Sequence, residues 1–200
     1  MTFPFTSCDG VIFDLDGTLW DTTAAISHVW TKEFGKSIPM AVIRSCMGKT
    51  AAEISQDIGV SLEQLAEVQH KENDYLWRSG GQVYPCVYST LEILRYRNIP
   101  CFIVSNCQAG YAECFVHSHA MGEFFQTWRT AAAGSKADNI RSILTAYRVS
   151  RALVVGDRRG DYEAAVRNKL PMVQALYGFG APMDEVTGIA AIKDLIDLLM

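Results

Sequence analysis

Four short, largely apolar runs each end in polar residues, and this pattern constrains the fold more than any other feature of the sequence. The runs cover residues 10–13, 101–104, 152–155 and 172–176. Runs of this length are typical of strands that are buried on both faces of a sheet. Amphipathic stretches lie between them, and strands that alternate with helices form a parallel sheet with right-handed crossovers. The sequence therefore predicts an α/β fold with a parallel sheet.

The long interval between the first two runs breaks this alternation. Ser61 and Gln64 match a capping box, which opens a helix. We therefore expect an all-α insert at about residues 20–84. Loops long enough to replace it are uncommon inside a compact domain, which disfavours the alternative of one continuous α/β domain. A second helix is indicated by an apolar stripe at Ile26, Val29, Trp30 and Phe34.

This interpretation divides the chain into a core and a helical cap domain. The core comprises residues 1–19 and 85–200, and the cap comprises residues 20–84. Tyr84 and Pro85 lie near the hinge at which the chain returns to the core. A chain of 200 residues is long enough for one domain of ordinary size that carries a small insert.

Composition narrows the class of partner. Eighteen basic against 22 acidic residues argue against a broad nucleic-acid-binding face. No apolar run approaches the roughly 18 residues that span a bilayer, and Met1–Cys8 does not resemble a signal peptide. The six cysteines form no Cys-x-x-Cys pair, so we expect free thiols in a reducing, cytoplasmic compartment. The expected partner is a small molecule rather than a nucleic acid or a membrane, and both a monomer and a dimer remain open.

Polar residues follow the carboxyl ends of three of the predicted strands. They are Asp14 and Asp16 after the first run, Ser105 and Asn106 after the second, and Asp157 after the third. Ligands of open parallel sheets bind outside the carboxyl ends of the strands. We therefore expect these residues, although far apart in sequence, to meet at one rim of the sheet.

Asp14 and Asp16 have the spacing of an acid–base pair. An extended backbone points both carboxylates the same way, and Gly17 permits a tight turn away from the sheet. Two carboxylates this close repel each other, so one ionises readily while the other retains a proton. One can then attack while the other donates and accepts protons. The alternative interpretation is an acidic turn after a strand, which is common.

The segment from Gly156 to Asp161 adds candidate metal ligands. Asp157 ends a predicted strand and Asp161 opens a predicted helix. With Asp14 they would form an oxygen-rich pocket that suits Mg²⁺, a hard cation. The pattern Gly-Asp-x-x-x-Asp is weak by itself, because a strand-end turn before a helix N-cap has the same residue types.

Two further segments offer groups that bind phosphate. Ser105 supplies a hydroxyl, and the backbone amides that follow it can face an anion at a helix start. Lys136 lies just before a predicted helix and can neutralise both a phosphoryl group and a nearby carboxylate. A solvated lysine at a helix start is the alternative.

In this order and with this spacing, the four segments resemble the haloacid dehalogenase superfamily, in the subclass with a helical cap inserted after the first motif. The resemblance covers nearly the whole chain and extends to phosphoglycolate phosphatase-like and β-phosphoglucomutase-like members. It implies a Rossmann-like three-layer core, Mg²⁺ as cofactor and a small phosphorylated metabolite as substrate.

The resemblance also implies a role for each motif residue. Asp14 would be the nucleophile that forms an aspartyl-phosphate. Asp16 would protonate the leaving alkoxide and then activate water, its backbone carbonyl would bind Mg²⁺, and Thr18 would help to orient it. The remaining implied roles are contact with the phosphoryl group for Ser105 and Asn106, charge neutralisation for Lys136, and metal binding for Asp157 with support from Asp161.

Asp16 also favours one reaction within the superfamily. Dehalogenating members lack an acid at this position, since a halide leaves without a proton, whereas an alkoxide needs protonation. We therefore expect a Mg²⁺-dependent phosphatase that acts on a small phosphate monoester similar to phosphoglycolate or a sugar phosphate. A phosphomutase of the same subclass and a catalytically idle binding or regulatory member are the alternatives.

Two pairs of basic residues remain. Arg44 and Lys49 lie in the expected cap, where related enzymes bring a turn over the core site, so contact with the substrate is a hypothesis beside ordinary surface charge. Arg158 and Arg159 stand inside the metal motif. Solvent exposure is the leading interpretation for this pair, and pairing with aspartates or attraction of anions is the alternative.

Overall fold

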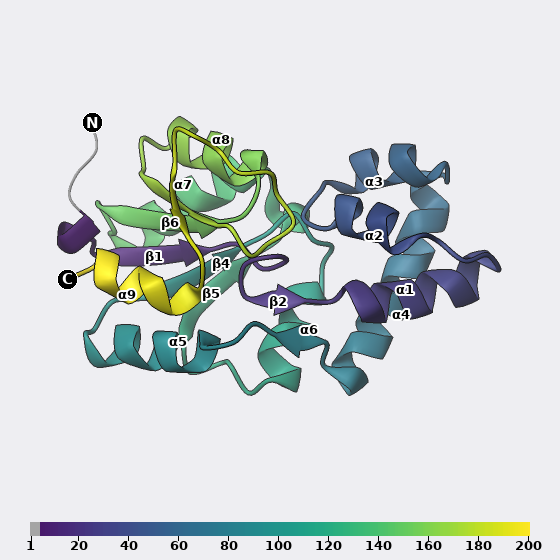
Figure 1. Cartoon of the computed structure of the whole chain (residues 1–200), viewed down its shortest axis with the longest axis horizontal. Coiled ribbons are helices and arrows are strands. Elements are labelled where there is room, and N and C mark those ends of the chain that lie inside the picture. The colour runs from purple at the N-terminus through teal and green to yellow at the C-terminus, as the bar shows by residue number, and fades with distance from the viewer. Residues whose placement is uncertain (1–4) are drawn as a thin grey trace.

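A six-stranded parallel sheet forms the centre of the computed structural model, which describes residues 5–200 (Figure 1). The order of the strands is β5-β4-β1-β6-β7-β8, and each neighbouring pair is parallel. The first four residues of the expected core lie outside the described residues. The strands are β1 (Gly10–Phe13), β4 (Cys101–Val104), β5 (Phe125–Arg129), β6 (Ala152–Gly156), β7 (Met172–Ala175) and β8 (Thr187–Ile189).

The four predicted strands are confirmed as β1, β4, β6 and β7, and all four are buried along their whole length. Side chains alternate between the two faces of the sheet, so Val11 and Phe13 enter one apolar core and Ile12 enters the other. The sequence pattern did not predict β5 and β8. Both are edge strands, and most of their residues are not fully buried, so neither has a continuous apolar run.

Helices cover both faces of the sheet, which confirms the predicted three-layer α/β core (Figure 1). Helices α7 (Lys136–Tyr147) and α8 (Arg159–Arg167) lie on one face. Helices α5 (Val87–Tyr96), α6 (Tyr111–Ser118) and α9 (Leu195–Leu198) lie on the other. Three short 3₁₀ helices within residues 5–200 complete this part of the chain, at Phe5–Ser7, Ala131–Ala133 and Ile192–Asp194.

Four helices gather at one end of the molecule, beyond the carboxyl ends of the strands (Figure 1). The predicted capping box at Ser61 and Gln64 is present at the start of the last of them. The predicted stripe is buried at Ile26, Val29 and Trp30. The helices are α1 (Thr23–Phe34), α2 (Met40–Cys46), α3 (Ala51–Ile58) and α4 (Leu62–Ser79).

A two-stranded antiparallel ribbon joins these four helices to the core. It pairs β2 (Trp20–Asp21) with β3 (Gln82–Val83), and the Trp20 Nε1–H group donates a hydrogen bond to the Gly80 carbonyl at 2.8 Å. The sequence pattern did not predict this ribbon, because strands of two residues have no recognisable period. In the described part of the chain, no helix is long and apolar enough to cross a membrane.

Candidate active site

The register of the central strands brings together the polar residues that follow them. Phe13 of β1 pairs with Ile103 of β4 on one side and with Val155 of β6 on the other. The residues that follow these strands therefore meet at one rim. The Asp14 amide extends the ladder, since its N–H group donates to the Val155 carbonyl at 2.8 Å.

Three buried carboxylates lie within reach of one cation. One oxygen each of Asp14, Asp157 and Asp161 can be chosen so that all three atoms lie within 4.8 Å of one another. Oδ2 of Asp157 accepts hydrogen bonds from the N–H groups of Phe179 at 2.6 Å and Gly180 at 3.1 Å, whereas its Oδ1 is buried without a partner among the described residues. A buried carboxylate oxygen with no donor, beside two more carboxylates, fits a hard cation such as Mg²⁺.

The backbone packs so closely around these carboxylates that glycine is required. Gly17 has φ +80°, and a Cβ atom there would lie 2.4 Å from Oδ2 of Asp157. A Cβ atom on Gly156 would lie 2.4 Å from Cγ of Asp161. Real Cβ atoms do not make contacts this short. Any larger residue at either position would displace the carboxylate, so both positions require glycine.

Lys136 bridges two of the carboxylates from the start of α7. Its Nζ donates to Oδ1 of Asp14 at 2.7 Å and to Oδ1 of Asp161 at 2.5 Å. Oδ2 of Asp161 accepts from the N–H groups of Asp157 and Arg158. Asp161 therefore holds both the lysine and the turn between β6 and α8. Burial alone would lower the pKa of Lys136, but the two carboxylates outweigh it and hold that pKa above its ordinary value.

Two hydroxyls hold the Asp16 carboxylate, which is not one of the three clustered carboxylates of Asp14, Asp157 and Asp161. Tyr111 Oη donates to Asp16 Oδ1 at 2.8 Å, and Thr22 Oγ1 donates to the same oxygen at 3.1 Å. Thr18 Oγ1 is buried without a hydrogen-bond partner among the described residues, so the expectation that Thr18 orients Asp16 stays a prediction. The Thr18 backbone carbonyl accepts from Tyr177 Oη.

Neither hydroxyl partner of Asp16 was predicted from the sequence. Thr22 stands at the start of α1, where a threonine normally caps the helix, but Asp21 accepts the Thr23 N–H group instead. Tyr111 lies at the start of α6 and has no motif of its own. Tyr111 can be recognised as a partner of Asp16 only when the structure shows that the loop after β4 lies beside β1.

Burial and like charge raise the pKa of three carboxyl groups at the rim, those of Asp14, Asp16 and Asp157. Burial, with Asp161 beside it, raises the pKa of Asp14 to about 6 although Lys136 opposes the shift. Burial and the nearby Asp14 raise the pKa of Asp16 to about 7. Burial, Asp14 and Asp161 raise the pKa of Asp157 to about 7. A cation among these groups would relieve the repulsion that contributes to all three shifts.

Comparison with known proteins identifies the family to which this chain belongs. The family model for haloacid dehalogenase-like hydrolases matches residues 11–175. This chain belongs to the haloacid dehalogenase-like hydrolase family. A comparison with curated proteins gives no match to this sequence.

Solved structures of low sequence identity share the whole fold of this family member. A haloacid dehalogenase-like hydrolase from Streptococcus pneumoniae is 22% identical with a TM-score of 0.80, over 98% of this chain and 100% of that chain. A predicted phosphoglycolate phosphatase from Haemophilus somnus is 15% identical with a TM-score of 0.84, over 96% and 98%. CbbY from Rhodobacter sphaeroides, solved with phosphate, is 14% identical with a TM-score of 0.80, over 94% and 96%.

The residues expected to bind phosphate lie in the loop after β4. Ser105 Oγ is buried without a hydrogen-bond partner among the described residues. The Asn106 side-chain amide donates to the Gly48 carbonyl in the helical segment at 3.1 Å. In the haloacid dehalogenase-like fold of this chain, Asn106 therefore joins the core to the four-helix segment.

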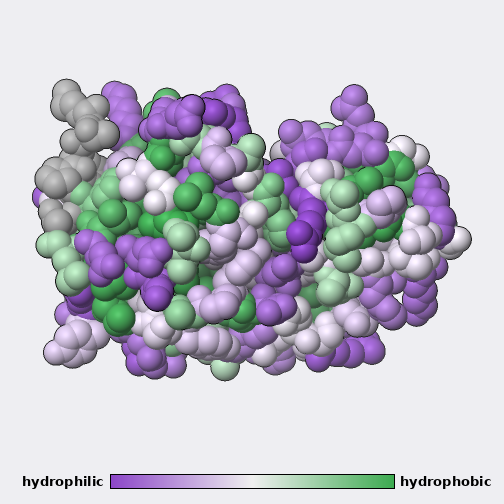
Figure 2. All heavy atoms as spheres, viewed as in Figure 1, coloured by the Kyte–Doolittle hydropathy of each residue, from purple (hydrophilic) through white to green (hydrophobic). Residues whose placement is uncertain are grey.

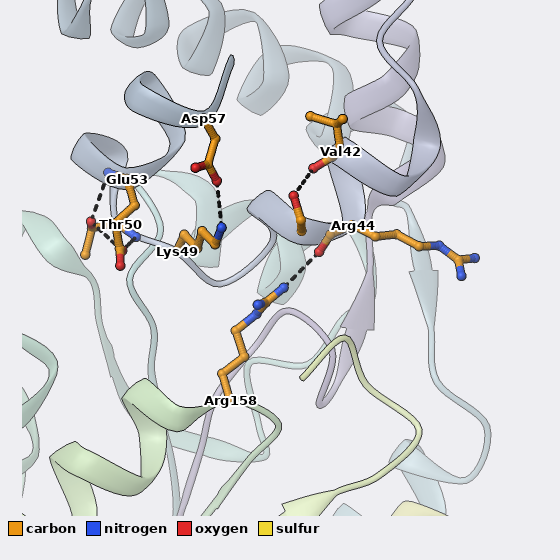
Figure 3. A network of polar contacts seen from close by, with 8 residues as sticks. Val42, Arg44, Lys49, Thr50, Glu53, Asp57 and Arg158 are labelled. Carbon is orange, nitrogen blue, oxygen red and sulfur yellow. Dashed lines mark hydrogen bonds and ion pairs between the residues drawn. The ribbon is translucent and has the colours of Figure 1, made fainter. Parts of the chain in front are cut away.

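The two basic residues expected to reach the substrate, Arg44 and Lys49, make their contacts within the helices or with the core. Lys49 Nζ forms an ion pair with Oδ2 of Asp57 at 2.6 Å. Figure 3 shows the side chain of Arg44 extending away from Arg158, while its backbone carbonyl accepts a hydrogen bond from Nη2 of Arg158 at 2.8 Å. Arg158 is therefore a contact between core and helices rather than a solvent-facing residue. Its neighbour Arg159 is exposed and forms an ion pair with Glu185.

A cavity lies between the four helices and the strand ends. Its lining includes Asp16 and Tyr111 from the core, and Trp30 and Glu72 from the helices. A second opening nearby is lined by Lys49, Asn106, Arg158 and Arg159, among others. Figure 2 shows the surface hollowed between the two parts of the molecule, with hydrophilic atoms on the rim.

Proposed function

We propose that this protein is a Mg²⁺-dependent phosphatase that hydrolyses small phosphate monoesters through an aspartyl-phosphate on Asp14. The observation that supports this most directly is the environment of Asp14. Its carboxylate lies between Lys136 and two further buried carboxylates, two residues from a second acid with a raised pKa. Nucleophile, charge neutralisation and proton donor are thereby assembled at one rim of the sheet.

The residues present fit Mg²⁺. Side chains of Asp14 and Asp157 and the backbone carbonyl of Asp16 would hold the ion, with Asp161 beside them. Within the described residues, the Asp16 carboxylate is not part of the metal-binding group, which leaves it available for proton transfer. When bound, the ion would offset the negative charges of nucleophile and phosphoryl group as they approach.

In the first half-reaction, an ionised Asp14 oxygen forms a bond to phosphorus while the bond from phosphorus to the alcohol oxygen breaks. Asp16 gives its proton to that oxygen as it leaves, so the product is a neutral alcohol. A raised pKa suits this role, because a carboxyl with an ordinary pKa would be ionised at neutral pH.

In the second half-reaction, the ionised Asp16 takes a proton from water while the water oxygen attacks phosphorus. The bond from phosphorus to Asp14 breaks, and inorganic phosphate leaves. Lys136, held by Asp161, would balance the charge of Asp14 and of the phosphoryl oxygens, and Ser105 and Asn106 would donate hydrogen bonds to those oxygens.

We further propose that residues 20–84 act as a cap over residues 1–19 and 85–200. The contacts of Arg158 with the Arg44 carbonyl and of Asn106 with the Gly48 carbonyl would hold the cap closed. Closure would exclude water from the strand ends and restrict the substrate to small phosphorylated metabolites.

A panel of phosphate monoesters assayed with and without Mg²⁺ tests this function, with Asp14→Asn as the blank. We expect free phosphate from at least one small ester, and none in the chelated enzyme or the blank. Isomerised product without free phosphate would indicate a phosphomutase. Absence of both products across the panel would indicate an idle member of the family.

A further inference from the structure

A buried acid in the helical segment faces the proposed catalytic acid across the cavity. Glu72 of α4 is 4% exposed and lines the same cavity as Asp16 and Tyr111. It occupies the buried stripe of its helix, in line with Leu65, Val68 and Leu76. An acid is almost never placed on such a stripe unless it is paired, so its position calls for a partner.

The partners of Glu72 in this structure are neutral. The Trp30 Nε1–H group donates to Oε1, and Gln108 Nε2 from the loop after β4 donates to Oε2 at 3.1 Å. Lys49 lines the cavity as well, but its ammonium group is paired with Asp57 (Figure 3). Among the described residues, no ion pair joins Glu72 to a basic side chain. Burial raises its pKa to about 7.

The cavity admits only a small group. The volume of the cavity is about 30 Å³, which is room for about two water molecules. Asp16 at the core side of this space would protonate the leaving oxygen, so the rest of the leaving alcohol extends toward the helices. Because Glu72 and Asp16 line the same small space, we expect the far end of an alcohol of two or three heavy atoms to lie near Glu72.

We propose that Glu72 determines specificity by accepting a hydrogen bond from the far end of the leaving alcohol. The preferred substrates are phosphate monoesters of short amino alcohols, followed by those of short diols. Esters with a terminal carboxylate are rejected, and these include phosphoglycolate, so this inference departs from the phosphoglycolate-like substrate that the sequence resemblance implies. This inference rests on the proposed phosphatase function. An ammonium group would give the buried carboxylate its missing countercharge, whereas a second carboxylate would place two like charges in a site with little water.

Four two-carbon esters differ mainly at that far end and provide the test. They are 2-aminoethyl, 2-hydroxyethyl, ethyl and carboxymethyl phosphate. In wild-type protein with Mg²⁺ we expect kcat/KM to fall in this order, with at least about a tenfold difference between the first and the last. Glu72→Gln keeps the shape of the side chain and removes its charge. We therefore expect the ratio of kcat/KM for 2-aminoethyl phosphate to kcat/KM for carboxymethyl phosphate to fall by about tenfold, while kcat/KM for ethyl phosphate changes little.

Glu67→Gln is the matched control, because Glu67 lies on the exposed face of the same helix. It should leave the order and the ratio unchanged. Thermal melting of both variants monitors folding. A ratio that Glu72→Gln leaves unchanged, or wild-type protein that prefers carboxymethyl phosphate, would overturn the assignment.

Binding separates this inference from the proposed reaction. Calorimetric titration of the four esters into Asp14→Asn protein with Mg²⁺ reports their order without turnover. The predicted order of Kd together with no hydrolysis by wild-type protein would reject the phosphatase function and keep the role of Glu72 in recognition. No binding by any ester, or tightest binding by carboxymethyl phosphate, would reject that role.

Discussion

The hydroxyl of Tyr111 donates a hydrogen bond to Oδ1 of Asp16 at 2.8 Å, across 95 positions of sequence. Thr22 Oγ1 lies 2.7 Å from the same hydroxyl and also donates to Oδ1. Both contacts fall on one oxygen of the carboxyl group, which leaves the other to exchange a proton with the substrate. Tyr111 thereby acts as a positioning residue that links the start of α6 to the loop after β1.

Replacement of Tyr111 by Phe should change the pH profile as well as the rate. The hydrogen bond favours the ionised form of Asp16, so its loss should raise the pKa of Asp16 above about 7, by about one unit. The acidic limb of the kcat profile should move upward by about one pH unit, and kcat at neutral pH should fall about fivefold, because water activation needs the ionised form. Tyr147→Phe, which removes a hydroxyl bonded to the Gln126 carbonyl on the far side of the core, is the control. A lower rate with an unmoved pH profile would indicate a purely structural role.

Arg158 and Arg159 provide a test of cap closure within one dipeptide. Arg158→Ala removes the hydrogen bond to the Arg44 carbonyl and should raise KM about two- to tenfold, with little change in thermal stability. Arg159→Ala removes an exposed pair with Glu185 on the core and should leave KM unchanged. Steady-state kinetics on a small ester measures both. Equal values of KM for the two variants would argue against a role of Arg158 in closure.

The effect of Mg²⁺ on stability should depend on pH. Burial raises the pKa of Asp14 to about 6 and of Asp157 to about 7, from an ordinary value of 3.8. The metal-free folded state therefore binds more protons than the unfolded state between about pH 4 and 7, and these groups lose their stabilising effect as pH rises through this window. Because Mg²⁺ binds the ionised carboxylates and displaces these protons, its effect on Tm should be larger at about pH 8 than at about pH 5.

Differential scanning fluorimetry at the two pH values, with Mg²⁺ or with chelator, measures this effect. Asp157→Asn should abolish most of the Mg²⁺-induced shift, whereas Asp74→Asn, an exposed change in α4, should retain it. A shift of the same size at both pH values in wild-type protein would contradict binding of the ion by these carboxylates.

The centre of the sheet could be predicted from the sequence because burial on both faces leaves a continuous apolar run. Residues 10–13 and 101–104 have such runs and form neighbouring strands. The edge strand Phe125–Arg129 could not be predicted in this way, since only Phe125 is fully buried. The ribbon of Trp20–Asp21 is fixed by tertiary contacts, which have no local period.

The residues of the candidate site also fall into those that could be predicted from the sequence and those that could not. Asp14 and Asp157 directly follow predicted strands, so their convergence follows from the topology of a parallel sheet. Thr22 and Tyr111 depend on side-chain packing between segments far apart in sequence, and no local pattern marks them. Glu72 does have a local sequence signal, because this acid interrupts an apolar stripe of helical period.

Removal of the proposed nucleophile should abolish turnover without unfolding the protein. Asp14→Asn is nearly isosteric, so Lys136 retains a side-chain oxygen as a partner. We expect kcat to fall by at least about 10³-fold with a folded far-UV circular dichroism spectrum. Phosphate release by Asp14→Asn at the wild-type rate would reject the assignment.

The most direct test of the mechanism is mass spectrometry of the enzyme during its first turnover. The enzyme is mixed with Mg²⁺ and an ester that it hydrolyses, and the reaction is quenched in acid within one turnover. The account predicts the added mass of one phosphoryl group on the peptide that contains Asp14, and no such addition in the Asp14→Asn protein. Phosphoryl mass on a different residue, or its absence throughout the first turnover while phosphate is released, would contradict it.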